Sequence, residues 1–231
     1  MTTPDPHSLE AKCSRVMERH SFATLVTFAG AAPTATHLPL LLQRDAGPHG
    51  TLFGHLARAN PQWGHFASGA EALVIFQGPH SYISPSYYAT SPAVPTWNYV
   101  AVHAYGVPGL IEDADGAAAL LAEMVRHYEA GMPVPWSGDL PEDYRAKLMQ
   151  GLVAFSIPIR RLEGTFKLGQ ARPPVDVMRT FEALSQSPDQ DARRLAEWME
   201  IEGMPVRPAP SADGQAGQRE RNPLPSARAG A

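Results

Sequence analysis

The chain has 231 residues, 44% of them hydrophobic, with 23 prolines and 19 glycines, which predicts one folded domain rich in turns. Its formal net charge of −4 leaves no broad basic surface, so nucleic acid is not an expected partner. The single cysteine cannot form an internal disulfide, and no apolar run approaches the roughly 18 residues of a membrane span, so we expect a cytoplasmic protein.

The first half of the chain predicts one helix followed by a series of strands. The helix begins at Asp5-Pro6, because an acid and a proline suit a helix start, and it ends near His20. Apolar, aromatic and β-branched residues then predict strands over residues 22–28, 33–43, 51–57 and 72–77.

The second half of the chain mixes strands with helices. We expect a strand over 96–112, helices after Asp115 and Pro141, and strands over 151–159 and 162–169. Two more helices follow, and the second has Leu195, Trp198 and Met199 on one side. From Pro205 onward the composition is dominated by proline, alanine, glycine, serine and charge, which predicts a disordered tail over 205–231.

The order of these elements indicates the fold class. About six strands with short intervening helices and no regular βαβ alternation favour a mainly β (α+β) fold over a Rossmann sheet. We therefore expect residues 1–204 to form one mostly antiparallel β-barrel domain with C-terminal helices.

The familiar catalytic signatures are missing, which leaves local clusters as the only clues. The first cluster is GHLARANPQWGHF, residues 54–66, in which Asn60-Pro61 starts a helix. Trp63 and Phe66 share one face of that helix as core anchors, and His65 lies at least about 100° around from them. His65 is either an imidazole offered to a metal or a solvent-facing histidine, and the sequence by itself favours the second interpretation.

Two aromatic clusters follow in QGPHSYISPSYY (77–88) and VPTWNYVAVHAYG (94–106). Tyr82 and its neighbours form either a wall that grips a ring system or a lid over the core. Trp97-Asn98 at a strand start places an apolar ring next to an amide that can hydrogen-bond to the polar edge of a ligand. His103 lies inside the strand, where we expect a core histidine.

Lys167 is conspicuous because the chain has three lysines against sixteen arginines. In EGTFKLGQ, residues 163–170, Phe166 and Leu168 share one strand face and Thr165 and Lys167 the other. Lys167 is either a desolvated acid–base group or part of a solvated strand face, and the pattern by itself favours the solvated face.

Taken in order, these segments resemble the blocks of the PaiB-like family. The matching blocks are HLPLLL, GHLARANPQW, FQGPHSYISPSYY, VPTWNYVAVHAYG, PEDY and EGTFKLGQ, and they run from about residue 15 to about residue 185. Members are commonly described as FMN-binding negative transcriptional regulators. The resemblance implies a split β-barrel related to flavin reductases and pyridoxamine phosphate oxidases, usually a homodimer with cofactor pockets at the subunit interface.

One branch of that family, the piperazate synthases, is the most similar. Its members bind heme b and cyclise N5-hydroxy-L-ornithine to L-piperazate through an N–N bond. Where regulators tend to carry a basic residue after NPxW, this chain has Gly64-His65, so the resemblance implies that His65 is an axial heme ligand. With heme as a Lewis acid, Lys167 is the expected proton donor or substrate-orienting group.

The resemblance also suggests residues that would surround the cofactor. Trp97 and Tyr82 are expected to pack on its ring, and Arg58 and Arg172 to meet heme propionates or the substrate carboxylate. Two alternatives stay open: an FMN-dependent oxidoreductase that uses the same barrel, and a non-enzymatic PaiB-type transcriptional regulator or sensor. The absence of a helix-turn-helix pattern and of a basic face weakens direct DNA binding.

Overall fold

The computed structural model describes residues 8–30 and 32–207. The elements of this part of the chain are, in order, α1 (Leu9–Arg19), β1 (Phe22–Phe28), β2 (Pro33–Pro39), β3 (Leu41–Gln43), β4 (Thr51–Ala57), the 3₁₀-helix η1 (Pro61–Ser68), β5 (Ala72–Ile83), the 3₁₀-helix η2 (Pro85–Tyr87), β6 (Thr96–Gly106), β7 (Gly109–Leu110), α2 (Ala114–Glu129), α3 (Glu142–Gln150), β8 (Leu152–Lys167), α4 (Pro174–Ser185) and α5 (Gln190–Ile201).

The strands form one antiparallel path in the order β2-β1-β5-β6-β8-β4-β3, with β7 paired to β8. The 16-residue strand β8 joins the two parts of the sheet, since its first half pairs with β4 and its second half with β6. The sheet curls without closing, which confirms the predicted split-barrel class. It has eight strands rather than about six, because the run 33–43 breaks at Leu40 and β7 has only two residues.

Alternation along the strands separates a buried inner face from an open outer face. In β6, Val100 and Val102 are almost fully buried, whereas Trp97 is 54% exposed on the other face. His103 shares that outer face, so the prediction of a core histidine is wrong. Its ring lies 3.9 Å from the Glu163 carboxylate in a directly opposed pair on β8.

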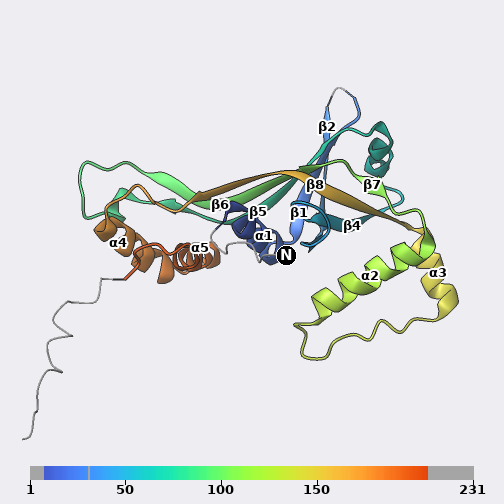
Figure 1. Ribbon diagram of the computed structural model, residues 1–231. Coiled ribbons are helices and arrows are strands. Elements are labelled where there is room, and N and C mark those ends of the chain that lie inside the picture. The colour runs from blue at the N-terminus through green and yellow to red at the C-terminus, as the bar shows by residue number, and fades with distance from the viewer. Residues whose placement is uncertain (1–7, 31, 208–231) are drawn as a thin grey trace, which may run out of the picture.

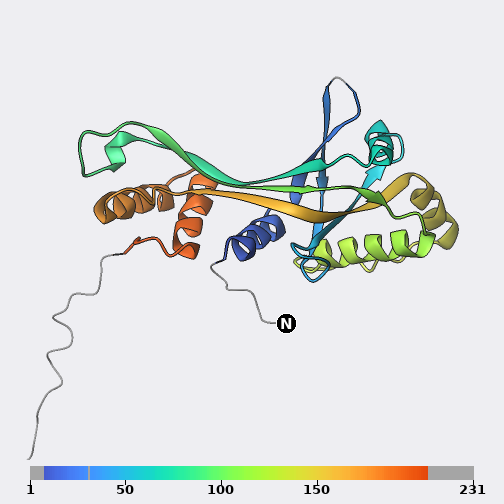
Figure 2. The ribbon, with the colours of Figure 1, turned by 45° about the horizontal axis from the view of Figure 1, so that its top comes forward.

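The helices gather at the two ends of the long sheet, with α1 between them (Figures 1 and 2). Helices α4 and α5 lie against one end of β5 and β6, whereas α2 and α3 lie near β4 and β7 at the opposite end. Buried Leu195, Trp198 and Met199 attach α5 to the core, as their spacing predicts.

The ends of the chain differ from the prediction in one respect. Helix α1 begins at Leu9 with Ser8 as its N-cap, whereas the predicted start at Asp5-Pro6 lies outside the described residues. Most of the predicted tail, 208–231, lies outside them as well. Within the part of the chain that is described, no helix has the length and hydropathy needed to cross a membrane.

Candidate functional site

The short helix η1 carries His65, and its start is fixed by polar contacts. Asn60 caps it: its side-chain oxygen accepts from the Gln62 amide at 3.0 Å, and its Nδ2 donates to Thr36 Oγ1 on β2 at 2.9 Å. Phe66 is buried and Trp63 packs against the core, which confirms these two residues as anchors. The helix is 3₁₀ rather than α, with about three residues per turn, so residues three apart are nearly eclipsed.

Gln62 ties η1 to the hairpin formed by β1 and β2. Its side chain is fully buried, and its Nε2 lies within 3.0–3.1 Å of Leu25 O, Thr34 O and Thr27 Oγ1. Two backbone carbonyls and a hydroxyl from different strands therefore meet one amide. Because a buried amide N–H is costly to leave unpaired, the Nε2 contacts hold η1 on the hairpin, although Gln62 Oε1 has no hydrogen-bond partner among the described residues.

His65 is half-buried on η1 and is oriented by the same hairpin. Its Nδ1 lies 2.9 Å from Thr27 Oγ1, the hydroxyl that also meets Gln62. Among residues 8–30 and 32–207 no hydrogen bond to Nε2 is formed. An imidazole held through Nδ1, with Nε2 available, is the arrangement that a metal-ligating histidine adopts. The residues present therefore fit a heme iron, which needs only one protein ligand.

An aromatic cluster occupies the outer face near the ends of β5 and β6. The Trp97 ring lies 6.0 Å from Tyr82 in an edge-on arrangement and 6.1 Å from His80. Trp97 and His80, together with Tyr99 and Gly78, border a shallow, mostly apolar groove of about 300 Å³, and Tyr82 lies outside its lining. Such a surface can pack against a flat ring, as expected for Trp97. The imidazole beside Trp97 is that of His80, whose Nδ1 lies 3.6 Å from the Asp191 carboxylate.

Lys167 ends β8 on the same outer face. Its ammonium donates to Thr96 Oγ1 at 2.8 Å, and Thr96 begins β6 next to Trp97. Thr165 shares this exposed face, whereas Leu168 is buried, as the alternation predicts. The lysine is therefore accessible and is steered by a single neutral hydroxyl.

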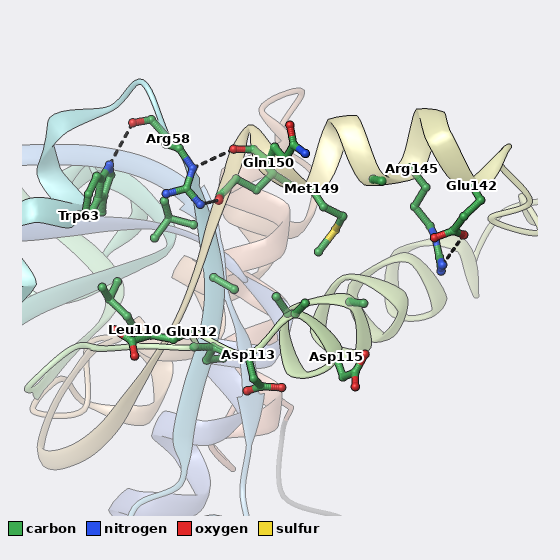
Figure 3. Close-up of a pocket in the computed structure, with 18 residues that line it drawn as sticks. Arg58, Trp63, Leu110, Glu112, Asp113, Asp115, Glu142, Arg145, Met149 and Gln150 are labelled. Atoms are coloured by element: carbon green, nitrogen blue, oxygen red, sulfur yellow. Dashed lines mark hydrogen bonds and ion pairs between the residues drawn. The ribbon is translucent and has the colours of Figure 1, made fainter.

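Arg58 borders the cavity that Figure 3 shows, of about 670 Å³, between α2, α3 and the start of β8. Its guanidinium donates to Gln150 O and Leu152 O, both at 2.8 Å, and its own carbonyl accepts from Trp63 Nε1. The side chain thus clamps the end of α3 to the chain that enters η1. The carboxylate-binding role expected for Arg58 stays a prediction.

Arg172 lies beyond β8, with its guanidinium 4.0 Å from the centre of the Tyr88 ring. This stacking holds part of the connection between β5 and β6, and the predicted role of Arg172 toward a propionate or carboxylate likewise stays a prediction. Nearby Asp176, which the sequence reasoning missed, is fully buried at the start of α4. The only local signal for it is an acid in the first turn of a helix that begins with proline.

Asp176 accepts hydrogen bonds from the Ala89 and Thr90 amides and from the Thr90 hydroxyl. Burial alone would raise the pKa of Asp176. The three hydrogen bonds, led by that from the Thr90 hydroxyl, and the nearby Arg172 charge outweigh burial and hold the pKa below its ordinary value. The carboxylate is therefore ionised and well satisfied.

A single chain does not bring His65 and Lys167 together. Thr27, which contacts His65, follows Val26, and Val26 pairs with Leu73 on β5. Thr27 is therefore level with Ala72, which pairs with Gly106 on β6. Lys167 pairs with Tyr99, seven residues along β6 from Gly106. At about 3.3 Å per residue the two positions are roughly 23 Å apart along the strands.

Comparison with known proteins finds a family match and a relative that spans most of the chain. Residues 1–161 match the family described as "Putative FMN-binding domain". The chain is 39% identical over 186 residues to "Protease synthase and sporulation protein PAI 2" of Bacillus subtilis (strain 168), a match that covers 80% of this chain and 88% of that protein.

Two solved structures share the fold at 15% identity. The flavocytochrome Anf3 from Azotobacter vinelandii superposes with a TM-score of 0.56, covering 71% of this chain and 69% of that one. A FAD and heme binding protein from Mycobacterium smegmatis gives 0.53, covering 71% and 73%. At such identities these likenesses show the split-barrel fold alone.

Proposed function

Because the chain belongs to the FMN-binding domain family, and its fold is shared with flavin- and heme-binding proteins, we propose that it is a heme-dependent piperazate synthase. In this proposal heme b is bound through His65. The substrate is N5-hydroxy-L-ornithine, which is cyclised to L-piperazate through an intramolecular N–N bond with loss of water.

The orientation of His65 carries the proposal. Its Nδ1 lies 2.9 Å from Thr27 Oγ1, which leaves the Nε2 lone pair for iron once Nδ1 holds the proton. Thr27 is itself fixed by Gln62, so the ring is held before any ligand arrives. A solvent-facing histidine on a polar helix side would need no such buried support.

Because the proposal assigns His65 and Lys167 to one site and a single chain holds them far apart, it requires a homodimer with each site built from two copies. The outer face carries exposed or half-exposed apolar side chains on adjacent strands, among them Phe22, Val26, Leu73, Ile75, Trp97 and Tyr99. An apolar patch on one open sheet face marks a protein–protein contact. In a two-fold dimer, Lys167 and Trp97 of one copy would complete the site at the other copy's His65.

The reaction is redox-neutral. The lone pair of the α-amine forms the N–N bond at N5 and the N–O bond breaks. The departing oxygen takes up one proton to leave as water, and the former α-amine nitrogen gives up one proton, so no net proton or electron is consumed. Heme supplies a Lewis acid to the hydroxylamine when it is bound. Lys167, exposed at the end of β8, would deliver the proton to the departing oxygen. Trp97 and Tyr82 would exclude water from the ring face.

Two measurements on purified protein test the proposal. Protein produced with heme available is expected to show a Soret band and to convert N5-hydroxy-L-ornithine to L-piperazate without added oxidant or reductant. Heme-loaded protein that leaves this substrate unchanged would refute the synthase assignment.

The composite site has its own test. Inactive His65→Ala and Lys167→Ala chains, unfolded together and refolded as mixed dimers, should regain about a quarter of wild-type activity, because half of the dimers then contain one intact site out of two. No recovery in dimers shown to be mixed would contradict a site shared between copies.

FMN binding is the second candidate function, favoured by the family match over residues 1–161. The aromatic groove beside Trp97 suits an isoalloxazine ring as well as a porphyrin. Protein that purifies with flavin absorbance near 450 nm, roughly, and without a Soret band would favour this candidate.

A further inference from the structure

The connection between β5 and β6 is held by a carboxylate from a distant helix. Asp176 Oδ1 accepts from the Ala89 amide at 2.7 Å and the Thr90 amide at 3.1 Å, and its Oδ2 accepts from the Thr90 hydroxyl. The side chain is fully buried. Packing alone would be served better by an apolar residue, since a buried charge costs free energy unless donors surround it.

Asp176 lies close in sequence to Lys167, and its partners lie close to Thr96. The chain leaves β8 at Lys167, passes Arg172 and enters α4, where Asp176 is in the first turn. On the other side, Thr90 is followed by the short run that ends at Thr96, the acceptor for the Lys167 ammonium. The carboxylate therefore joins the two backbone segments that also meet at the Lys167–Thr96 hydrogen bond.

Arg172 adds a second contact between the same two segments. Its guanidinium stacks on Tyr88, the residue before Ala89, and α4 packs on η2. The two segments, 167–176 and 88–96, are therefore joined at both ends: by Asp176 and Arg172 at one end and by the Lys167–Thr96 hydrogen bond at the other. Thr96, at the end of the β5–β6 ladder opposite Ile83, is the first strand residue that movement of the 84–95 connection would reach, and its hydroxyl is the one that contacts Lys167.

We propose that Asp176 is a positioning residue: it anchors the 84–95 connection so that Thr96 holds the Lys167 ammonium in one place. The catalytic value of this placement rests on the proposed function, whereas the placement itself is a property of the protein without cofactor. Asp176 neither lines the groove beside Trp97 nor contacts His65, and it lies beyond residues 1–161, which match the FMN-binding domain family.

Amine labelling of the cofactor-free protein tests the placement directly. The chain has three lysines, Lys12, Lys147 and Lys167, so mass spectrometry can follow each after brief acetylation. The Thr96→Val variant removes the hydroxyl that accepts from the Lys167 ammonium. Its labelling rate therefore gives the largest increase that loss of this hydrogen bond can cause. Asp176→Ala should give a similar increase, about fivefold for the loss of one hydrogen bond, with Asp176→Asn between it and wild type.

The internal control is exposed Lys147 on α3, whose labelling should not change in any variant. The matched variant is Asp189→Ala, because Asp189 caps α5 through the Asp191 amide and makes no contact with the 84–95 connection in the part of the chain that is described. It should leave Lys167 labelling at the wild-type rate. Circular dichroism confirms that each variant is folded before labelling.

The labelling has clear contrary outcomes. Wild-type Lys167 labelling in a folded Asp176→Ala protein would overturn the proposal, and so would a Thr96→Val variant that labels like wild type. An equal increase in Asp189→Ala would also overturn it, since general loosening of the C-terminal helices would then explain the effect.

Kinetics of the heme-loaded protein extend the test to the reaction. Asp176→Ala should lower kcat about fivefold with KM nearly unchanged and the Soret band in place, and Asp176→Asn should recover part of kcat. An unchanged kcat would overturn the role in catalysis. If the wild-type protein forms no product, the proposed function fails, and the labelling result still decides whether Asp176 positions Lys167.

Discussion

The regions around His65 and Lys167 hold their proposed functional side chains in different ways. His65 is half-buried, and its Nδ1 partner Thr27 is supported by a fully buried glutamine that spans two strands. Lys167 is exposed and has one hydroxyl partner at 2.8 Å. The proposed metal ligand is built into the barrel, whereas the proposed proton donor stays exposed at the end of a strand, where one hydroxyl positions it.

The largest expected effect comes from removing the imidazole. His65→Ala should abolish the Soret band of protein purified with heme, because the axial ligand is lost. His37→Ala is the matched control: His37 lies on the β1–β2 hairpin that carries Thr27, and its Nδ1 lies 2.9 Å from Thr24 Oγ1. An unchanged Soret band in His65→Ala would contradict the ligand assignment.

Removing the lysine should leave binding intact and slow the chemistry. Lys167→Ala should lower kcat about 100-fold, the lower end of what a general acid contributes, with no change in the Soret band. Lys147→Ala, on exposed α3, should keep wild-type kcat. Wild-type turnover in Lys167→Ala would show that Lys167 has no part in the reaction. The contrast between a half-buried ligand and an exposed proton donor would then no longer apply.

A smaller effect is expected when His65 stays but loses its support. Thr27→Val should weaken heme binding by about 10- to 100-fold, since a ligating histidine depends on the partner of its other nitrogen. Heme titration followed by absorbance measures the affinity. Thr24→Val removes the same kind of threonine–histidine contact at His37 and should bind heme like wild type.

The smallest expected effect is a pH dependence at the Lys167 end. The folded pKa of Asp176 lies below its ordinary value of 3.8, so the unfolded chain takes up the proton first as the pH falls. The contribution of Asp176 to stability is therefore present above about pH 5 and is lost as the pH falls through the folded pKa. Asp176→Asn carries no titrating group at this position.

Urea unfolding at a series of pH values, from about pH 6 to about pH 3, measures this contribution. The difference in unfolding free energy between wild type and Asp176→Asn should be constant at the upper end and should shrink at the lower end. A difference that grows in acid would show that the carboxylate is destabilising in the folded state.

Local sequence patterns were sufficient for many of the elements. Asn60-Pro61 marks the start of η1, and the spacing of Leu195, Trp198 and Met199 marks the buried side of α5. Both signals arise within a few residues, where capping and periodicity act directly on the backbone. The assignment of His103 to the core failed because alternation defines two faces of a strand without saying which face is covered.

The contacts of Asp176 could not be read from the sequence. Its partners Ala89 and Thr90 precede it by 87 and 86 residues, so no periodicity links them. Arg58 is a similar case, since its acceptors Gln150 and Leu152 lie 92 and 94 residues away. Its charge made it a candidate for carboxylate binding, whereas in the fold the guanidinium contacts two carbonyls.

The sequence by itself determined that this is a mainly antiparallel β protein with His65 on a capped helix and Lys167 on the strand face opposite Phe166 and Leu168. Those properties depend on neighbours in the chain. Only the tertiary structure decided that Thr27 and Gln62 orient His65 and that Asp176 supports the Lys167 end of the sheet. It also decided that Thr27, which contacts His65, and Lys167 lie roughly 23 Å apart along the strands of one chain. Strand register and long-range packing set those relations, and both depend on the whole sheet being assembled.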